Sequence, residues 1–473
     1  MTRRIAFIEL NAGLWKPGTF LRHSSIEPLA IEYIGSIAKA EGYDVKIIQQ
    51  QQRSEQEVLH EILDFSPQII GFSVMTYNHL ASLLLAKKIK QHNSKILTVF
   101  GGYHPSYYPE IVKEDAIDFI IIGEGEETFR ELLQTLNTAK SYFNNIKGLA
   151  FYDKKLHINK PRERIKDLDS LPNPIRDPDI LTNCKISGLN YPPLSKQKYV
   201  AQVLYSRGCS HSCTFCCSPF LYGSKVYFRS PERVVAEMQG IKDRYGTNYF
   251  YFADLSFNLN KKKVIALCNE MIKRKLNINW FCMCRVDNID TELLQYMQDA
   301  GCSRIGFGID ALNEATLNRV KPGQKLTIEQ TYEALKLTNS MGIIVRTFII
   351  IGYPWETQED IEKTKEILRT MPIDEIRIGL LTALPGSAIY EELKKQNLIL
   401  TDDLSKYTTD EYIIKHPEIS ALEMIEIRDR IFKEFYQSKE YEQRKQEKLK
   451  TFPHLKQSYD EFYEFLKEKG ILK

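Results

Sequence analysis

Three cysteines stand close together near the middle of the chain, within SRGCSHSCTFCCSP at residues 206–219. Cys209, Cys213 and Cys216 have the spacing C-x-x-x-C-x-x-C. Thiolate sulfur is a soft ligand that suits iron–sulfur chemistry, and a short loop can present each thiolate to a different iron. Three ligands around a four-iron cluster would leave one iron open to a small molecule. The spacing therefore predicts an iron–sulfur site on this loop.

A zinc knuckle is the alternative metal site for these cysteines. Structural zinc usually has four protein ligands and commonly uses two C-x-x-C pairs, so His211 or Cys217 would have to supply the fourth ligand. The chain has nine cysteines, an odd number, and its first ten residues are predicted as a strand rather than a signal peptide. Both features favour metal ligation and reduced thiols over a disulfide framework.

Glycine-rich turns follow two apolar runs in the first third of the chain. They are Gly101-Gly102-Tyr103-His104-Pro105 and Gly123-Glu124-Gly125-Glu126-Glu127. Glycine allows a sharp turn or a close approach of the backbone to a ligand, and doubly wound domains bind ligands at the carboxyl ends of their strands. The alternative is that these glycines only terminate the strands.

The composition narrows the class of protein. Lys and Arg total 64 against 61 for Asp and Glu, so the net charge of +3 gives no electrostatic reason to expect nucleic acid as a partner. No stretch approaches about 20 uninterrupted apolar residues, so we expect no membrane span. Hydrophobic residues make up 43% of the chain, enough for a sizeable core. We expect a cytoplasmic protein.

Two strand–helix alternations and a helical tail must position these residues. The first alternation predicts strands near 5–8, 45–48, 69–73, 97–100 and 119–122, joined by amphipathic helices. The second predicts strands near 202–205, 249–252, 280–284, 304–309, 345–351 and 375–381, with helices between them. From Glu418 onward the pattern is helical and rich in Glu and Lys. This tail either covers the active site or packs on the second domain.

These patterns predict an α/β protein with four parts. Residues 1–152 are expected to form a doubly wound, Rossmann-like domain with a parallel sheet. Residues 153–198 are a proline-rich connector. Residues 199–400 are expected to form a partial (β/α)₆ barrel of the TIM type, with its active site at the carboxyl ends of the strands. Residues 401–473 form a helical C-terminal region.

The cysteine loop, with Phe215 before its last cysteine and a predicted strand before its first, resembles the radical S-adenosylmethionine (SAM) superfamily. Other segments resemble the motifs of that family in the order of its barrel strands. They are YFAD at 251–254, CRVD at 284–287, GFGID at 306–310, TFIIIGYPWET at 347–357 and LPGS at 384–387. This ordering disfavours the zinc alternative.

The resemblance implies a [4Fe–4S] cluster on Cys209, Cys213 and Cys216, whose open iron binds the amino and carboxylate groups of SAM. Reductive cleavage of SAM would give a 5′-deoxyadenosyl radical. By the same resemblance, SAM is bordered by Phe215, Asp254, Arg285, Asp310 and Leu381. The alternatives are that the two aspartates only cap the loops or helices that follow them and that Arg285 pairs with Asp287. Asp310 stands where the family signature usually has Glu.

The first domain resembles the cobalamin-binding domain that precedes many radical SAM barrels. The resemblance rests on a proline-initiated helix at 28–42, the GG-x-H-P and GEGE loops, and the connector LPNPIRDP at 171–178. It implies a cobalamin site formed by Gly101, Gly102, His104, Gly123, Glu124, Gly125 and Glu126. The D-x-H-x-x-G motif is absent, and Glu9–Gly13 occupies its place. Either cobalamin binds without that histidine, or the domain keeps the fold without the cofactor. His104 is a cobalt ligand or a hydrogen-bonding loop residue.

The resemblance leads to the hypothesis of a cobalamin-dependent radical SAM methyltransferase. It would methylate an unactivated carbon of a small metabolite or peptide, with electrons from a donor such as flavodoxin or ferredoxin. The alternatives are another radical reaction, with or without cobalamin, such as rearrangement, cyclisation or epimerisation, and a non-catalytic cobalamin or iron–sulfur sensor. An epimerase needs a cysteine as hydrogen donor, and the candidates are Cys217, Cys282 and Cys302. Methylthiotransferases carry further cysteine ligands in their first domain, whereas residues 1–183 contain no cysteine.

Overall fold

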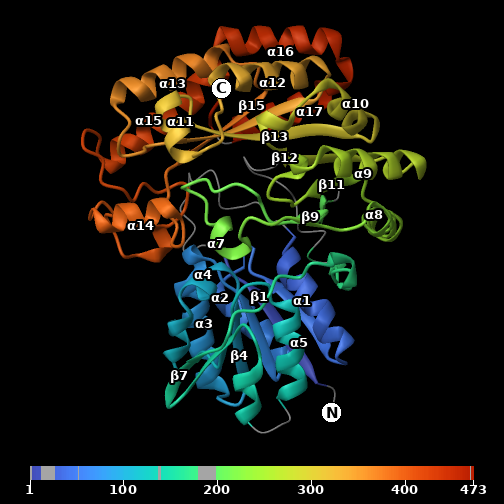
Figure 1. Cartoon of the computed structure of the whole chain (residues 1–473), viewed down its shortest axis with the longest axis vertical. Helices are drawn as coiled ribbons and strands as arrows, with labels where there is room; N and C mark the ends of the chain where they lie inside the picture. Colours follow the sequence, from blue (N-terminus) through green and yellow to red (C-terminus); the bar gives the residue numbers. More distant parts are fainter. Residues whose placement is uncertain are drawn as a thin grey trace. The chain divides into compact units, whose positions relative to one another are not determined.

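The computed structural model (Figure 1) describes residues 3–11, 27–51, 53–136, 140–178, 180, 199–468 and 470–472. The chain divides into two compact units. The first contains the described residues up to Ile180 together with Asp403–Tyr407, and the second contains the described residues from Tyr199 to Asp402 and from Thr408 onward. The expected domain limits at residues 152, 198 and 400 stay predictions, and residues 179 and 181–198 of the connector lie outside the described residues.

The first unit is built around one sheet with the strand order β2-β1-β3-β4-β5-β6-β7. The five runs predicted as strands are confirmed and pair in parallel. An antiparallel hairpin, which the sequence pattern had not indicated, continues the sheet past residue 152. The strands are β1 (Arg4–Glu9), β2 (Asp44–Gln49), β3 (Ile69–Ser73), β4 (Leu97–Gly101), β5 (Phe119–Ile121), β6 (Leu149–Asp153) and β7 (Lys155–Ile158).

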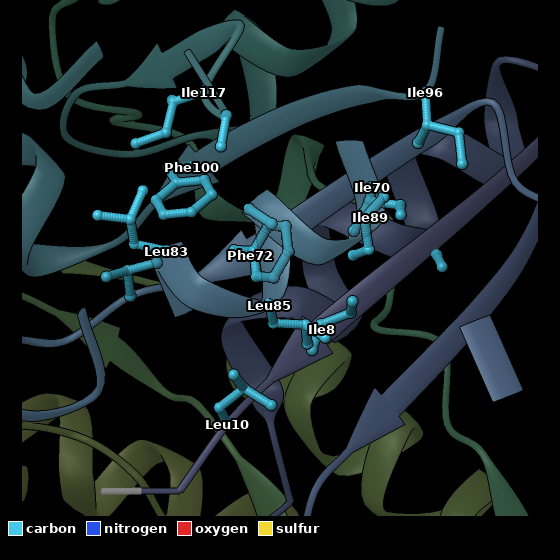
Figure 2. Close-up of a cluster of buried hydrophobic side chains, with 14 of the residues drawn as sticks. Ile8, Leu10, Ile70, Phe72, Leu83, Leu85, Ile89, Ile96, Phe100 and Ile117 are labelled. Carbon is cyan, nitrogen blue, oxygen red and sulfur yellow. The ribbon is translucent and has the colours of Figure 1, made fainter. Parts of the chain in front are cut away.

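Helices cover both faces of this sheet, as a doubly wound fold requires. In Figure 1, α1 and α5 lie on one side of the strands and α2 and α3 on the other. Phe7 of β1 packs on Phe129 of α5, with ring centroids 5.5 Å apart. Figure 2 shows the core on the opposite face, where Ile8, Ile70 and Phe72 meet side chains of α3. The helices are α1 (Leu29–Ala40), α2 (Glu55–Phe65), α3 (His79–His92), α4 (Tyr103–Tyr107) and α5 (Glu126–Thr135).

The strand order places the switch point of this fold between β1 and β3, where the chain turns to opposite sides of the sheet. The loops that leave β3 and β4 are tied together there. The N–H of Val74 donates to the carbonyl of Gly101 at 2.8 Å, and the N–H of His104 donates to the carbonyl of Val74 at 3.1 Å. Asn78 donates its amide to the carbonyl of Leu10 at 2.9 Å, which joins the end of β1 to the same set. The carboxyl edge of the first sheet is therefore fixed by its own backbone.

The second unit contains six parallel strands in the order β15-β14-β13-β12-β11-β8, as predicted for a partial barrel. The strands are β8 (Ala201–Val203), β11 (Tyr249–Phe252), β12 (Asn279–Cys284), β13 (Cys302–Asp310), β14 (Ile344–Ile351) and β15 (Glu375–Leu380). A short antiparallel ribbon of β9 (Ser206–Arg207) and β10 (Tyr227–Phe228) flanks the cysteine loop. The predicted barrel order therefore holds.

Helices alternate with these strands. They are α7 (Ser218–Tyr222), α8 (Pro231–Tyr245), α9 (Lys261–Lys273), α10 (Thr291–Asp299), α11 (Glu314–Val320), α12 (Ile328–Ser340), α13 (Gln358–Thr370) and α14 (Ala388–Lys395). The helix side of the sheet is closely packed. Trp280 is completely buried, contacts Phe252 edge-on at 5.2 Å and donates its indole N–H to the carbonyl of Ala300 at 2.9 Å.

Three helices follow the barrel, α15 (Ala421–Gln437), α16 (Lys439–Thr451) and α17 (Lys456–Glu468). They pack at the amino ends of β14 and β15. Lys448 of α16 lies 2.5 Å from the carboxylate of Asp374, which directly precedes β15, and Tyr459 of α17 donates to the same carboxylate. Because the cysteine loop follows a strand's carboxyl end, this tail packs on the barrel at the end away from that loop. None of the helices in the described ranges combines the length and apolar character of a membrane span.

Candidate functional site

The cysteine loop is pinned in its middle to two other segments of the second unit. The N–H of Thr214 donates to the carbonyl of Val320 at 2.9 Å, and the N–H of Ile389 donates to the carbonyl of Thr214 at 2.9 Å. Val320 ends α11, and Ile389 lies in the first turn of α14. The position of the loop is thus set by backbone hydrogen bonds, independently of any bound group.

The structure brings the three predicted cysteines together. Burial raises the pKa of each thiol, and each pKa is raised further by another thiol of the set: Cys213 acts on Cys209, Cys216 on Cys213, and Cys209 on Cys216. Hydrogen bonds partly offset this, because the N–H of Ser218 donates to Sγ of Cys216 and Nε2 of Gln324 donates to Sγ of Cys213, both at 3.4 Å. A cationic metal centre would convert this mutual repulsion into stabilisation of three thiolates.

The donor set fits an iron–sulfur cluster. Among the described residues, no three His, Cys, Asp or Glu side chains gather closely enough to hold a single metal ion. A [4Fe–4S] cluster makes a different demand, since each cysteine binds its own iron at a separate corner. His211, which the zinc alternative needed, has a pKa lowered by burial and by the charge of Arg285. Cys209, Cys213 and Cys216 as the cluster ligands stay a prediction that this chemistry supports.

Asp254 holds the start of the cysteine loop. Its buried carboxylate accepts hydrogen bonds from the N–H of Tyr205 at 3.0 Å, from the N–H of Ser206 at 2.5 Å and from the Ser206 hydroxyl. Burial raises its pKa to about 6, although these bonds favour the charged form. These contacts hold an earlier segment of the chain rather than capping the loop or helix that follows Asp254, and contact with SAM stays a prediction.

Arg285 pairs with Asp287, which is the alternative role considered for it from the sequence. Its Nε and one terminal nitrogen donate to the two carboxylate oxygens of Asp287 at 2.9 and 2.6 Å. Its charge also counters the raised pKa of Cys209, so the guanidinium lies close enough to influence the cysteine loop. Contact of Arg285 with SAM stays a prediction.

Asp310 ends β13 in an unusual backbone conformation. Its φ of +69° lies in the left-handed region, and the register of β13 with β14 shifts between Gly308 and Asp310. Strain of this kind is commonly stored at functional sites. Lys321 compensates the carboxylate, since its buried ammonium lies 2.7 Å from Asp310 and donates to the carbonyl of Gly308 at 2.8 Å. The charge of Asp310 raises the pKa of Cys213, so this ion pair borders the cysteine loop.

Phe215 and Leu381, which were expected to border SAM, differ in exposure. Phe215 is half-buried in the cysteine loop. Leu381 is buried directly after β15, and its N–H donates to the carbonyl of Ile351 at 2.9 Å. Both positions follow the carboxyl ends of barrel strands, and their contacts with SAM stay predictions.

Three residues near the cysteines were missed from the sequence. Lys321 and Gln324 come from the turn after α11, and Tyr353 comes from the loop after β14. The hydroxyl of Tyr353 is completely buried, has no hydrogen-bond partner among the described residues, and has a pKa raised by burial and by the charge of Asp310. The Pro-Gly turn at 322–323 was a usable signal, because it places polar residues at the carboxyl end of a barrel strand.

The other buried cysteines belong to the core. Cys282 and Cys284 lie on β12 as expected, with their sulfurs 3.6 Å apart. Cys268 of α9 lies near Cys302 and Cys284, since both raise the pKa of its thiol beyond the effect of burial. These thiols therefore lie on the side of the sheet that α9 covers. This position counts against Cys282 and Cys302 as hydrogen donors to a substrate.

The first glycine loop of the N-terminal unit has a steric requirement. Gly102 has a φ of +106°, and a Cβ placed there would lie 2.8 Å from the carbonyl oxygen of Val74. Gly101 ends β4 and has no such clash. The glycine at 102 is therefore required by the backbone itself, and contacts of either glycine with cobalamin stay predictions.

The second glycine loop leads into α5. Gly123 has a φ of +82° and donates its N–H to the Ser106 hydroxyl at 3.0 Å, and Gly125 precedes the helix in close contact with Ile34. Glu124 is turned to the connector, where it accepts the N–H of Ile165 at 2.9 Å. Glu126 is buried in the first turn of α5. The predicted role of this loop toward cobalamin remains a prediction.

Two histidine rings pack at the carboxyl edge of the first sheet. His79 and His104 have ring centroids 4.3 Å apart, and His104 also contacts Tyr108 at 5.1 Å. Burial lowers the pKa of His104 to about 3, with the neighbouring His79 adding to the effect, so its ring is neutral above that pH. Nδ1 of each ring has no hydrogen-bond partner among the described residues, and the same holds for the buried hydroxyls of Thr76 and Ser82.

These unsatisfied groups fit a polar cofactor at the switch point. Buried polar atoms are rarely left without partners, because each costs about 1–3 kcal/mol. Cobalamin carries amide side chains and a nucleotide tail that could satisfy donors and acceptors of this kind. The segment Glu9–Gly13, which stands in the place of the D-x-H-x-x-G motif, is described only in part, since Ala12 and Gly13 lie outside the described residues.

Comparisons with known proteins find a match for each of the two units. Residues 21–133 match the family described as the B12 binding domain, and residues 203–368 match the radical SAM superfamily. The chain is 29% identical over 414 residues to an uncharacterised methyltransferase of Pyrococcus horikoshii, covering 86% of this chain and 87% of that protein. It is 30% identical over 431 residues to an anaerobic magnesium-protoporphyrin IX monomethyl ester cyclase of Rubrivivax gelatinosus, covering 88% and 74%.

The fold is that of a solved structure with the same two domains. The radical SAM methyltransferase TsrM of Kitasatospora setae, solved with cobalamin and a [4Fe–4S] cluster bound, matches with a TM-score of 0.67 at 19% identity, covering 84% of this chain and 78% of that one. The matches confirm the predicted cofactors, which are a [4Fe–4S] cluster, SAM and cobalamin. The chain therefore belongs to the radical SAM superfamily and, within it, to the methyltransferase-like enzymes that use cobalamin.

Proposed function

We propose that this enzyme methylates an unactivated carbon atom of a small metabolite or peptide. One observation carries the proposal. The same chain combines a triangle of cysteines with a doubly wound domain whose carboxyl edge holds buried polar groups without partners among the described residues. When bound, the cluster and SAM supply radical chemistry, and cobalamin supplies a methyl group.

The residues of the chain hold these groups and keep charges in place. Cys209, Cys213 and Cys216 would bind the cluster, while the backbone of Thr214 fixes the middle of their loop and the carboxylate of Asp254 fixes its start. The buried pair of Asp310 and Lys321 would border SAM without adding net charge. Positioning of this kind, with water excluded, is the contribution that a protein makes to cofactor chemistry.

The proposal includes the partner and the compartment. Radical cleavage of SAM requires an electron, which a flavodoxin or ferredoxin would deliver. Three thiols that must stay reduced suit the cytoplasm better than an oxidising compartment. The substrate is proposed to be a small molecule or peptide, since the net charge of +3 gives no reason to expect nucleic acid.

The test is an anaerobic titration of the iron-reconstituted protein with hydroxocobalamin, followed by reduction in the presence of SAM. Stoichiometric cobalamin in a base-off spectrum, with both S-adenosylhomocysteine and 5′-deoxyadenosine formed, is the expected result. If no cobalamin binds and 5′-deoxyadenosine is the only product, methyl transfer by this route is wrong. If the protein binds its cofactors but leaves SAM intact after reduction, it is a sensor instead.

Cyclisation is the second candidate, because the Rubrivivax gelatinosus relative is named as a cyclase and shares 30% identity with this chain. SAM with a deuterated methyl group separates the two reactions once a substrate is found. A methylated product carries the deuterium, whereas a cyclised product forms without it. The same experiment detects a rearrangement or an epimerisation, since neither adds the label.

A further inference from the structure

Gln324 contacts the cysteine loop from a segment that none of the family motifs includes. We propose that Gln324 is a positioning residue of the iron–sulfur centre, which raises the reduction potential of the bound cluster by donating a side-chain N–H to the sulfur of Cys213. The inference rests on the proposed ligation by Cys209, Cys213 and Cys216. Gln324 would thereby help to set how readily the cluster accepts an electron.

The contact is specific in its geometry. Nε2 of Gln324 lies 3.4 Å from Sγ of Cys213, within hydrogen-bond range for sulfur. Oε1 of the same amide is buried and has no hydrogen-bond partner among the described residues. A thiolate bound to iron can only accept a hydrogen bond, so the N–H rather than the oxygen must face it. Among the described residues, the side-chain amide of Gln324 therefore forms its hydrogen bond with Sγ of Cys213.

A rigid turn holds Gln324 in this place. The N–H of Gln324 donates to the carbonyl of Lys321 at 3.2 Å, closing a turn through Pro322 and Gly323. Gly323 has a φ of +76°, which matches the third position of a type II turn, where glycine is preferred after proline. Lys321, the first residue of the turn, is itself held by Asp310 at 2.7 Å. Lys321 and Gln324, the two ends of the turn, therefore both interact with groups at or beside Cys213.

The expected effect follows from charge. Reduction adds one electron to the bound cluster and changes it from the 2+ to the 1+ state, with no bond made or broken. Hydrogen bonds to the sulfurs are among the factors that set the potential of such clusters, because they stabilise the more negative state. Removing the N–H of Gln324 should therefore make the cluster harder to reduce. A hydrogen bond to a charged acceptor is strong enough to change the reduced-to-oxidised ratio by about tenfold.

The experiment is a redox titration of reconstituted full-length protein, with dithionite as the electron source and mediators present, followed by electron paramagnetic resonance. The variants are Gln324→Leu, which removes the amide, and Gln324→Met, which keeps the length of the side chain but has neither an N–H donor nor a charge. The control is Gln443→Leu on α16, where an exposed glutamine donates to Glu447 one turn away. At the potential that half-reduces the wild type, both Gln324 variants should show a reduced-to-oxidised ratio about tenfold lower, equivalent to about 59 mV for one electron.

The outcomes separate this inference from the proposed ligation. If both Gln324 variants match Gln443→Leu in potential and iron content, the inference is overturned. If the variants hold no cluster, the wild type decides: protein labelled with ¹⁵N-glutamine should show nitrogen coupling to the reduced cluster in pulsed resonance, and its absence overturns the inference. If the wild type itself binds no [4Fe–4S] cluster, the ligand assignment fails first.

Discussion

In the second unit the cysteine loop is held through Thr214 by backbone bonds to Val320 and Ile389, and its start is held by Asp254. In the first unit the backbone of the carboxyl edge is tied in a similar way, through Val74. The side chains differ in kind, however, because the first unit offers ring nitrogens without hydrogen-bond partners among the described residues, such as Nδ1 of His104 and of His79, whereas the second offers three thiols. The two regions are thus similarly ordered in backbone but present different groups to a cofactor, although Tyr353 and Gln324 of the second region also keep a buried oxygen without a partner among the described residues.

The difference reflects how each cofactor is held. A cluster is bound by a few strong bonds at fixed corners, so the loop must present its sulfurs in the correct places. Cobalamin is a large molecule that many weaker contacts can hold, and the groups that make them cost stability until the cofactor binds. Removing polar groups of the first unit should therefore lower its affinity for cobalamin. Removing the cysteines of the second unit should abolish cluster binding.

The largest effect is expected from replacing Cys209, Cys213 and Cys216 together by alanine. Iron binding and SAM cleavage should both be abolished, because no other group in the described loop can replace three thiolates. Iron content and 5′-deoxyadenosine formation after reduction measure the loss. The matched control is Cys217→Ala in the same loop, which should keep both properties. Retention of iron or of SAM cleavage by the triple variant would contradict the ligand assignment.

Gly102→Ala should destabilise the first unit by about 3 kcal/mol or more, since the new Cβ meets the carbonyl oxygen of Val74 at 2.8 Å in a left-handed conformation. Gly123→Ala is the matched control. Its φ of +82° is also left-handed, but no atom lies within 4 Å of the Cβ position, so about 1 kcal/mol is expected. Denaturant unfolding compares the two. Equal losses would show that the close approach to Val74 is not what requires Gly102.

The sequence predicted the parallel strands of both sheets, because their apolar runs are short and rich in β-branched residues, but it did not indicate the antiparallel hairpin of β6 and β7. It was less successful with amphipathic detail. Along α3, apolar residues at helical spacing differ in burial, since Leu85 and Ile89 are buried but Leu80 and Leu84 remain about half exposed. Spacing along a helix indicates a face, whereas neighbours that pack against that face come from distant parts of the chain and leave no local signal.

The site was predictable where a motif lies on one loop and less so where segments converge. Cys209, Cys213 and Cys216 were predicted as cluster ligands from their spacing and from the family resemblance, and this assignment stays a prediction. Gln324 and Tyr353 reach the cysteines only because the turn after α11 and the loop after β14 meet at one end of the barrel. The pairing of Lys321 with Asp310 has the same origin. Such long-range contacts depend on strand order, which the sequence pattern does not specify residue by residue.

Glu356→Gln tests a buried carboxylate of the second unit that already has partners. One oxygen accepts the N–H groups of Gly352 and Tyr353, both at 3.1 Å, and burial raises its pKa to about 7. The folded state binds this proton more tightly than the unfolded state, whose pKa is near 4.5. Stability should therefore fall as the pH rises from about 4.5 to about 7.

Glutamine offers the same acceptor without the charge. The variant should lack this pH dependence and be more stable than the wild type at pH 8 by about 1–3 kcal/mol. Urea unfolding at several pH values measures the difference, with Glu359→Gln in the exposed first turn of α13 as the control. A variant that is less stable at pH 8 would show that the charge itself is needed by the loop.

His104→Leu tests a buried group of the first unit that lacks a partner for Nδ1 among the described residues, and it should have the smallest effect on stability. Because Nδ1 has no partner among the described residues, its removal should change the free energy of unfolding at pH 8 by less than about 1 kcal/mol, while affinity for hydroxocobalamin falls about tenfold. The pKa of His104 is lowered by burial to about 3, so the wild type should lose stability as the pH falls below about 6.5, and the variant should lose less. His92→Leu, at an exposed position of α3, is the control for both measurements. Unchanged cobalamin affinity would mean that the unsatisfied His104 is a feature of packing rather than of cofactor binding, and the contrast between the two regions would then rest on the remaining groups of the described residues, His79, Thr76 and Ser82.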